Sequence, residues 1–384
     1  MKITLLGWIG IAIAMGVATG FFFPKWIVEL MATFNAVFGQ FLGFLIPLII
    51  VGFVAPAIAE IGTKAGKLLV ATALLAYGAT LFAGLLSYFT GTLTFPSLIS
   101  GEIAVSAIED SPEVTPFFTV DIPPLMSVMT ALVFAFMLGL GTAYTRSVTL
   151  GGVITEFRDI VQKTIRAVVL PLLPVYIFGI FLNMTHTGQV GTILATFLKI
   201  IIVIFILHVF ILVMQYCIAA VIGRRNPFKM LGTMMPAYFT ALGTQSSAAT
   251  IPVTLAQAIK MGVSKDVAGF VIPLCATIHM SGSTLKIVAC ALALMLMQGM
   301  HYDTGMFVHF IAMLGITIIA APGIPGGAIM ASLGLLSSIL GFSEQQNALM
   351  IALYIAMDSF GTACNVTGDG ALAVIIDRFF GPKR

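Results

Sequence analysis

The chain has 384 residues, of which 59% are hydrophobic and only 9% charged, and its mean hydropathy is +1.10. Domains that fold in water carry about 25% charged residues, so this composition excludes them and indicates a polytopic helical membrane protein. The formal net charge of +3 is too small to indicate binding to nucleic acid. The four cysteines lie in apolar stretches without paired spacing, which predicts packing residues and neither disulfides nor a zinc site.

Eight apolar stretches are long enough to cross a bilayer. They cover residues 3–23, 34–58, 68–92, 125–145, 162–183, 193–222, 266–298 and 346–380. The first stretch lacks a convincing cleavage site, so we expect a retained span and no signal peptide.

Two further apolar stretches, 226–258 and 305–341, are interrupted by Ser, Thr, Gly and Pro at residues 243–252 and 320–327. Each is expected to form two half-helices joined by an irregular tip. Irregular backbone at membrane depth is tolerated only where protein or a watery cavity satisfies its polar groups. A pair of interrupted segments is therefore typical of a transporter's binding site.

Charge placement predicts the orientation in the membrane. Lys and Arg follow the second, fourth and sixth spans and end the chain, whereas residues 102–121 contain five carboxylates and no basic residue. Because basic loops stay in the cytoplasm, both termini are expected in the cytoplasm. The protein itself is expected in the plasma (inner) membrane. The first interrupted stretch then enters from the cytoplasm and the second from outside, as an inverted pair.

The last span carries polar residues at regular helical spacing. Asp358, Thr362, Asn365 and Asp369 stand at i, i+4, i+7 and i+11, which places them on one helix face. Carboxylates on a membrane helix usually face the bundle interior or a watery cavity. At a rise of about 1.5 Å per residue the two carboxylates lie roughly 16 Å apart, which indicates one solute site and one cation site.

Several motifs in order resemble a known family. They are TQSSAATIP at 244–252, IPLCATIHMSGS at 272–283, GIPGG at 323–327, NVTGD at 365–369 and LIPLII at 45–50. Together they resemble the dicarboxylate/amino acid:cation symporters, a group that includes archaeal aspartate transporters and mammalian glutamate and neutral amino acid carriers. The likeness covers nearly the whole chain, and its most specific part is 235–380.

The resemblance implies an all-α fold of eight transmembrane helices and two re-entrant helical hairpins, built as inverted repeats that work as an elevator. It implies a static scaffold at 1–66 and 122–190. It implies a mobile transport domain that comprises the third span with its outer loop (67–121) and residues 191–384, in a homotrimer. Two gated hairpins favour a carrier over a channel, and we find no motif that indicates an enzyme.

The resemblance also implies a solute site. Asp358 would bind the solute's α-amino group, while Thr362 and Asn365 would hydrogen-bond its polar groups. The α-carboxylate would lie at the two hairpin tips, since the N-terminal ends of half-helices favour anions. The expected binding residues are Gln245, Ser246, Ser247, Ile324, Gly326, Asp358, Gly361, Thr362 and Asn365. The alternative for Asp358 is a structural ion pair with Lys286.

Gly361 indicates the charge of the solute. Members of the family that carry acidic solutes have an arginine here, whose guanidinium suits a carboxylate. Gln245 stands where some aspartate transporters have arginine, so it offers no replacement. These residues predict a small neutral amino acid as solute. An acidic amino acid or a dicarboxylate, with Lys286 as the surrogate cation, remains the alternative.

The cation site departs from the family pattern. Asp369 and Asn365 match oxygen ligands for Na⁺. The family's Asn-Met-Asp-Gly-Thr is here His279, Met280, Ser281, Gly282 and Ser283, and the third span has Leu75 and Ala76 where hydroxyls are expected. His279, Ser281 and Ser283 are the remaining candidate ligands. We expect a deep site that is absent or no longer selects Na⁺.

Coupling therefore uses Na⁺ or H⁺, with no other cofactor expected. A buried lysine needs a partner, so Lys286 either pairs with Asp369 at the lost cation site or extends to an interface or a polar cavity. His279 either carries the coupling proton or is a hydrogen-bonded structural group.

Overall fold

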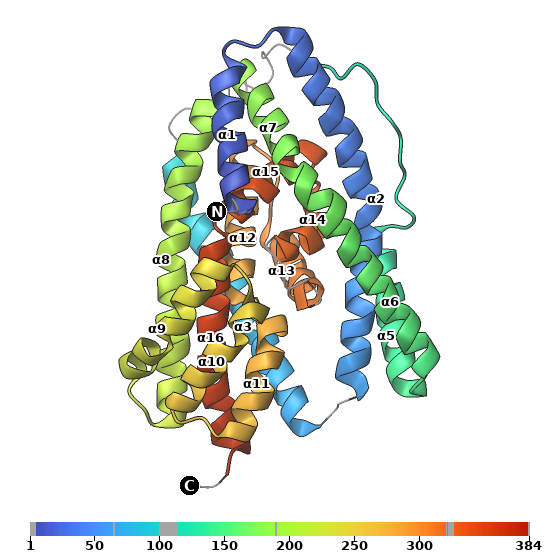
Figure 1. Ribbon diagram of the computed structural model, residues 1–384. Helices are drawn as coiled ribbons and strands as arrows, with labels where there is room; N and C mark the ends of the chain where they lie inside the picture. Colours follow the sequence, from blue (N-terminus) through green and yellow to red (C-terminus); the bar gives the residue numbers. More distant parts are fainter. Residues whose placement is uncertain are drawn as a thin grey trace.

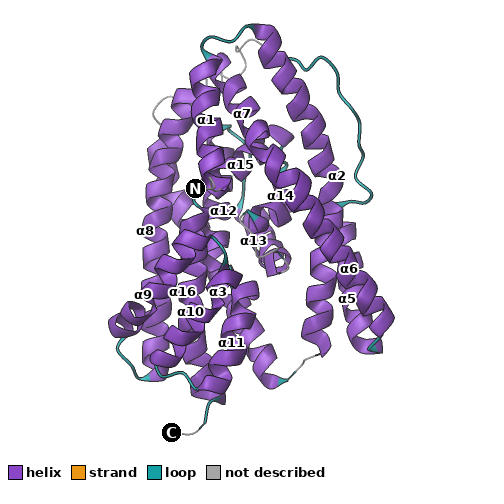
Figure 2. Ribbon diagram, viewed as in Figure 1, coloured by secondary structure: helices purple, strands orange, loops and turns teal. Residues whose placement is uncertain are grey.

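The computed structural model describes residues 5–63, 66–99, 114–188, 190–319, 321 and 326–382, and within these ranges all regular structure is helical (Figures 1 and 2). The helices are α1 (Leu5–Gly20), α2 (Lys25–Thr63), α3 (Lys67–Ile99), α5 (Val128–Thr145), α6 (Val148–Thr164), η1 (Ile165–Val169), α7 (Leu170–His186), α8 (Val190–Gly223), α9 (Pro227–Thr244), α10 (Ser247–Lys260), α11 (Lys265–Ile278), α12 (Ser281–Met297), α13 (Thr304–Ile319), α14 (Gly327–Leu340), α15 (Glu344–Ala356) and α16 (Asp358–Phe380). Among the described residues, six helices are long and apolar enough to cross a membrane, or seven if the bent pair α15–α16 is one span. The protein is a multi-pass membrane protein.

The helices pack in two groups. One contains α1, α2, α5, α6 and α7, and the other contains α3, α8 to α12 and α16. In Figure 1, α2, α5 and α6 form one side of the molecule and α8 and α9 the opposite side. Helices α13, α14 and α15 lie between the groups and contact both. The helix with the polar stripe, α16, is therefore buried within the second group.

The segment before α7 differs from the prediction. We expected residues 146–161 to be a basic loop, but α6 occupies most of this segment and continues through the π-helical η1 into α7. Ile154 and Val161 of α6 are buried, two helical turns apart, and α6 packs on α2. The charged residues on the other faces of α6 lower its average hydropathy, which explains why a search for apolar stretches missed it.

The expected span 346–380 is not one straight helix. Its two parts, α15 and α16, meet at Met357 with a bend of 62°. The expected span 266–298 is also interrupted, because α11 ends at Ile278 and α12 begins at Ser281. This second break lies within the motif 272–283 that resembles the family, and both breaks lie beside the polar stripe.

Both interrupted stretches form two helices, as predicted. Helices α9 and α10 are joined by a turn in which Gln245 has φ of 53°, and Ser246 caps α10 by accepting a hydrogen bond from the Ala249 N–H. The turn is shorter than expected, since α10 already begins at Ser247. Helices α13 and α14 form the second pair, and residues 320 and 322–325, including Ile324, lie outside the described residues.

The contact between α5 and α2 generates a stability prediction. A Cβ added at Gly139 of α5 would lie 2.7 Å from the Ala55 carbonyl oxygen and from Ile58 Cβ, whereas one added at Gly141 meets nothing within 4 Å. We expect Gly139→Ala to separate the helices and destabilise the protein by about 1–3 kcal/mol. Thermal unfolding of the purified protein in detergent, followed by size-exclusion chromatography, measures this. Gly141→Ala is the matched control, and equal melting of the two variants would contradict the packing argument.

Candidate functional site

The polar stripe predicted on the last span lies on α16. Its first residue, Asp358, begins the helix, and Thr362, Asn365 and Asp369 follow on the same face. All four side chains are buried, with exposed fractions between 1% and 6%. Because ionised carboxylates are strongly disfavoured in an apolar interior unless they are paired, their partners define the chemistry of the site.

Both interrupted stretches reach the start of α16. At the second, the Gly326 N–H donates a hydrogen bond of 2.8 Å to Asp358 Oδ2. At the first, Gln245 Nε2 donates a hydrogen bond of 2.8 Å to Ser359 Oγ. Gly326 has φ of 77°, a left-handed conformation that glycine adopts without strain. Residues from two distant parts of the sequence therefore meet at neighbouring positions of one helix.

Asp358 forms an ion pair with Lys286 of α12. Lys286 Nζ lies 2.9 Å from Asp358 Oδ1, and the lysine is 0% exposed. Its Nζ also donates to the carbonyl oxygens of Tyr354 at 3.5 Å and Met357 at 3.4 Å, and lies 3.4 Å from the centre of the Tyr354 ring. The ammonium thus satisfies carbonyls at the C-terminal end of α15, where the chain bends. The ion pair with Lys286 is present, and the binding of a solute's amino group by Asp358 stays a prediction.

The space beside Gly361 is filled by the same lysine. A Cβ added at Gly361 would lie 2.8 Å from Lys286 Nζ and 2.9 Å from its Cε. The expectation that no positive group replaces the family's arginine is therefore wrong. A cation is present at this position, and it comes from α12 instead of α16.

Asn365 holds the start of α12. Its Oδ1 accepts hydrogen bonds from the backbone N–H groups of Gly282 at 2.8 Å and Ser283 at 3.3 Å. Its Nδ2 donates to Ser283 Oγ at 3.0 Å. These bonds satisfy N–H groups that the break before α12 leaves without helical partners. The side chain expected to bind solute and cation thus also connects α16 to α12.

Asp369 is paired with His279. His279 Nδ1 lies 2.9 Å from Asp369 Oδ1, and both side chains are buried. Gln215 of α8 extends the cluster, with Nε2 at 3.3 Å from His279 Nε2 and donating to Ser281 Oγ at 3.3 Å. The expected pairing of Lys286 with Asp369 is wrong, because Lys286 pairs with Asp358 and histidine takes its place at Asp369.

Oxygen atoms around Asp369 are available for a cation. Asp369 Oδ2 and Gln215 Oε1, both in this cluster, are buried and have no hydrogen-bond partner among the described residues. Carboxylate and amide oxygens are donors that a hard cation such as Na⁺ prefers. These two groups therefore fit the chemistry of a small cation.

The predicted solute-binding hydroxyls lie near the same region, although no bound solute tests them. Ser246 caps α10, Ser247 is the first residue of that helix and is buried, and Thr362 is 6% exposed on α16. Their role in holding a solute stays a prediction.

Sequence reasoning missed four residues of this site. They are Thr80, whose hydroxyl accepts from the Met280 N–H at 3.3 Å; His208, bonded to the Gly282 carbonyl oxygen; Gln215; and Tyr354. Gln215 could have been found, since an amide within the most apolar span is unusual. The same holds for His208, because an ionisable side chain within a membrane span is rare. Thr80 and Tyr354 give no such signal, because hydroxyl-bearing residues are common in helices.

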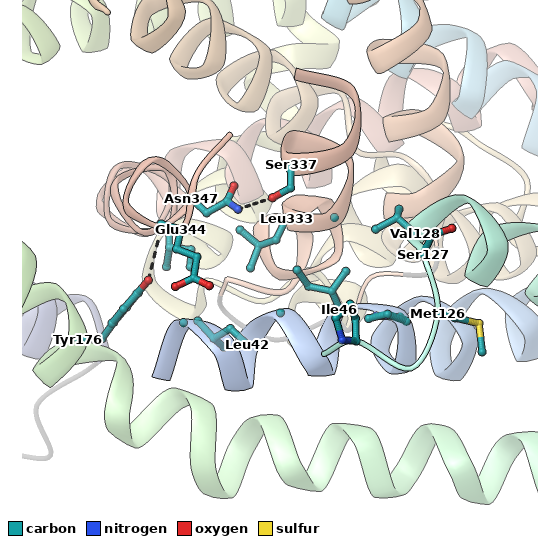
Figure 3. A pocket seen from close by; sticks show the side chains of 16 residues that line it. Leu42, Ile46, Met126, Ser127, Val128, Tyr176, Leu333, Ser337, Glu344 and Asn347 are labelled. Carbon is teal, nitrogen blue, oxygen red and sulfur yellow. Dashed lines mark hydrogen bonds between the residues drawn. The ribbon is translucent and has the colours of Figure 1, made fainter. Parts of the chain in front are cut away.

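A separate cavity of about 270 Å³ lies between α2 and α14 (Figure 3). Apolar side chains such as Leu42, Ile46 and Leu333 line most of it, and none of its lining residues belongs to α16. At one end Glu344 Oε1 accepts a hydrogen bond from Gln40 of α2 at 3.0 Å, and its carbonyl accepts one from Tyr176 at 3.4 Å. The cavity thus lies where the first helix group contacts α14 and α15.

In comparisons with known proteins, the matching family model and the curated relatives all describe membrane transporters. A model of the sodium:dicarboxylate symporter family matches residues 5–379. Mouse excitatory amino acid transporter 2 is 34% identical over 157 residues, which are 41% of this chain and 27% of the mouse protein. Human excitatory amino acid transporter 1 is 30% identical over 237 residues, 59% of this chain and 43% of the human protein. An excitatory amino acid transporter of Caenorhabditis elegans is 27% identical over 262 residues, 66% of this chain and 51% of the worm protein.

The chain spans about a quarter to a half of the length of these curated relatives. The family model, by contrast, covers nearly all of the chain, including both interrupted stretches and α16. The chain belongs to the sodium:dicarboxylate symporter family.

Proposed function

We propose that the protein is a secondary active transporter that couples the symport of a small neutral amino acid to a cation. One observation carries this proposal: Gly326 and Gln245, from the two interrupted stretches, bond to the adjacent residues Asp358 and Ser359. A polar site enclosed by two tips deep in an apolar bundle suits a carrier that occludes its solute. The names of the family and of the excitatory amino acid transporters support cation-coupled symport of amino acids or dicarboxylates, and the neutral charge of the solute is the proposal's own addition.

The two helix groups suggest how the site moves. The group around α2 would be the static scaffold, and the group around α16 the mobile transport domain of an elevator. The bond between Gln40 and Glu344 joins α2 of the first group to α15, and it would break if α15 moves with the transport domain. A homotrimer in the plasma membrane, with both termini in the cytoplasm, completes this proposal on family grounds.

The bonds of Lys286 support a neutral solute. An ammonium has three protons, and Asp358, Tyr354 and Met357 accept them all. In this arrangement no proton of Lys286 is directed at a side-chain carboxylate of the solute. Thr362, Ser246 and Ser247 provide neutral hydrogen-bonding groups that suit a small polar amino acid.

A second candidate is a dicarboxylate or acidic amino acid. A bare Asp358 would repel a solute that lacks an amino group, but the Lys286 ammonium at 2.9 Å neutralises it. If Lys286 turned one proton toward the solute, the site would accept an additional carboxylate. Uptake measurements distinguish the two candidates.

We expect purified protein in proteoliposomes to take up labelled neutral amino acids in preference to aspartate and succinate. Each solute is measured with an inward Na⁺ gradient and, separately, with an inward proton gradient. Asp358→Asn should lower amino acid uptake at least about tenfold, because a charged hydrogen bond to the solute's ammonium is lost. Asp266→Asn, at the start of α11, is the control. Preference for aspartate or succinate would favour the second candidate, and no uptake of any solute would refute the proposal.

The cation site provides a separate prediction. His279→Asn removes the imidazole from Asp369 Oδ1 and restores the residue that the family pattern has there. We expect the Na⁺ concentration for half-maximal uptake to fall by about tenfold, since the carboxylate regains an open oxygen. His186→Asn, at the end of α7, is the matched control. An unchanged Na⁺ dependence would argue that Asp369 does not hold the coupling cation.

A further inference from the structure

Each carboxylate oxygen of Asp358 has a partner within the protein. Its Oδ1 faces Lys286 Nζ at 2.9 Å, and its Oδ2 accepts from the Gly326 N–H at 2.8 Å. The side chain is 3% exposed. The protein thus supplies its own cation to the carboxylate that would bind the solute's amino group.

The two partners of Asp358 come from different parts of the molecule. Gly326 belongs to the second interrupted stretch, whereas Lys286 belongs to α12, which packs directly on α16 and on α3. The break before α12 is bonded to Asn365 of α16. Lys286 and Asp358 therefore belong to one packed unit, and their pairing does not depend on the position of the second tip.

We propose that Lys286 is a built-in counter-cation that neutralises Asp358 whenever the solute site is empty. This inference rests on the proposed function and concerns the return half of the transport cycle. On loading, the ammonium of an amino acid takes over as partner of Asp358, and Lys286 keeps its bonds to the carbonyl oxygens of Tyr354 and Met357. On release, the lysine ammonium pairs with the carboxylate again, and no ion from solution is needed there.

The physical reason is the cost of moving an unpaired charge. A carboxylate without a partner is strongly disfavoured inside a bilayer, so an empty domain with a bare Asp358 would not cross it readily. With Lys286 beside Asp358, the pair carries no net charge, whether the domain moves inward or outward across the bilayer. The unloaded domain can therefore return, and the carrier accumulates solute by net uptake in addition to exchanging it.

Two modes of transport separate this role from a merely structural one. Net uptake into empty vesicles requires the unloaded domain to return. Exchange against solute already inside the vesicle does not, because the domain is loaded in both directions and Asp358 always has the solute's ammonium. The variant is Lys286→Met, which keeps most of the side-chain volume beside Gly361 and removes the charge.

We expect Lys286→Met to lower the ratio of net uptake to exchange by at least about tenfold, measured with the best neutral amino acid of the panel. Lys286→Arg keeps the charge and should bring the ratio back toward that of the unmodified protein. Lys260→Met, on the exposed last turn of α10, is the control. If Lys286→Met does not yield folded protein, Lys286→Gln removes the charge and keeps a hydrogen-bond donor for the same measurement.

Three results would overturn the inference. An equal fall of net uptake and exchange would make Lys286 a structural or solute-binding residue only, and an unchanged ratio would leave it without a role in the return. Unmodified protein that exchanges solute but shows no net uptake would refute the inference and leave the proposed function intact. Absence of both modes would refute the proposed function itself.

Discussion

A carboxylate buried in an apolar bundle has to be paired, and α16 carries two of them. Both partners come from neighbouring positions of the chain: His279 lies just before α12 and Lys286 lies within it. Removing one partner of a buried ion pair typically costs about 3–5 kcal/mol, because the other charge stays buried alone. The ion pair of Lys286 with Asp358 and the hydrogen bond of His279 with Asp369 therefore determine the register of α12 against α16 in addition to apolar packing, and the rest of the site is arranged around these two contacts.

The broken helices follow the same reasoning at the level of the backbone. Each break leaves N–H or carbonyl groups without helical partners at a depth where water is scarce. Asn365 accepts from the N–H groups at the start of α12, and Lys286 donates to carbonyls at the end of α15. Asn365 and Lys286 thus have two tasks, since they satisfy the breaks and also form the site. This explains why the site lies where four interrupted elements meet.

The sequence was sufficient to predict which residues share the polar face of α16 and where the two interrupted stretches break. Helical spacing and turn residues are local signals, so they can be read without knowledge of the packing. It did not predict which carboxylate Lys286 pairs with. Spacing within α12 places Lys286 on a face, but the rotation and height of α12 relative to α16 depend on packing between distant segments. The same limit applies to the bend at Met357 and to Gln215, which comes from a third helix. The glycine at 361 gives no sign of a cation in the sequence. Only the packing of α12 against α16 shows that the Lys286 side chain fills the space beside it.

The contact between Gly361 and Lys286 has a consequence for how this protein can change over evolutionary time. A side chain at 361 would displace the end of the lysine, whose Nζ lies 2.8 Å from the position of a Cβ there, and would so disturb its pairing with Asp358. Loss of the lysine alone, conversely, would leave an empty volume and Asp358 without its cation. A change at either position alters the same ion pair, so we expect the two positions to change together. We expect an arginine at 361 to occur with a different residue at 286.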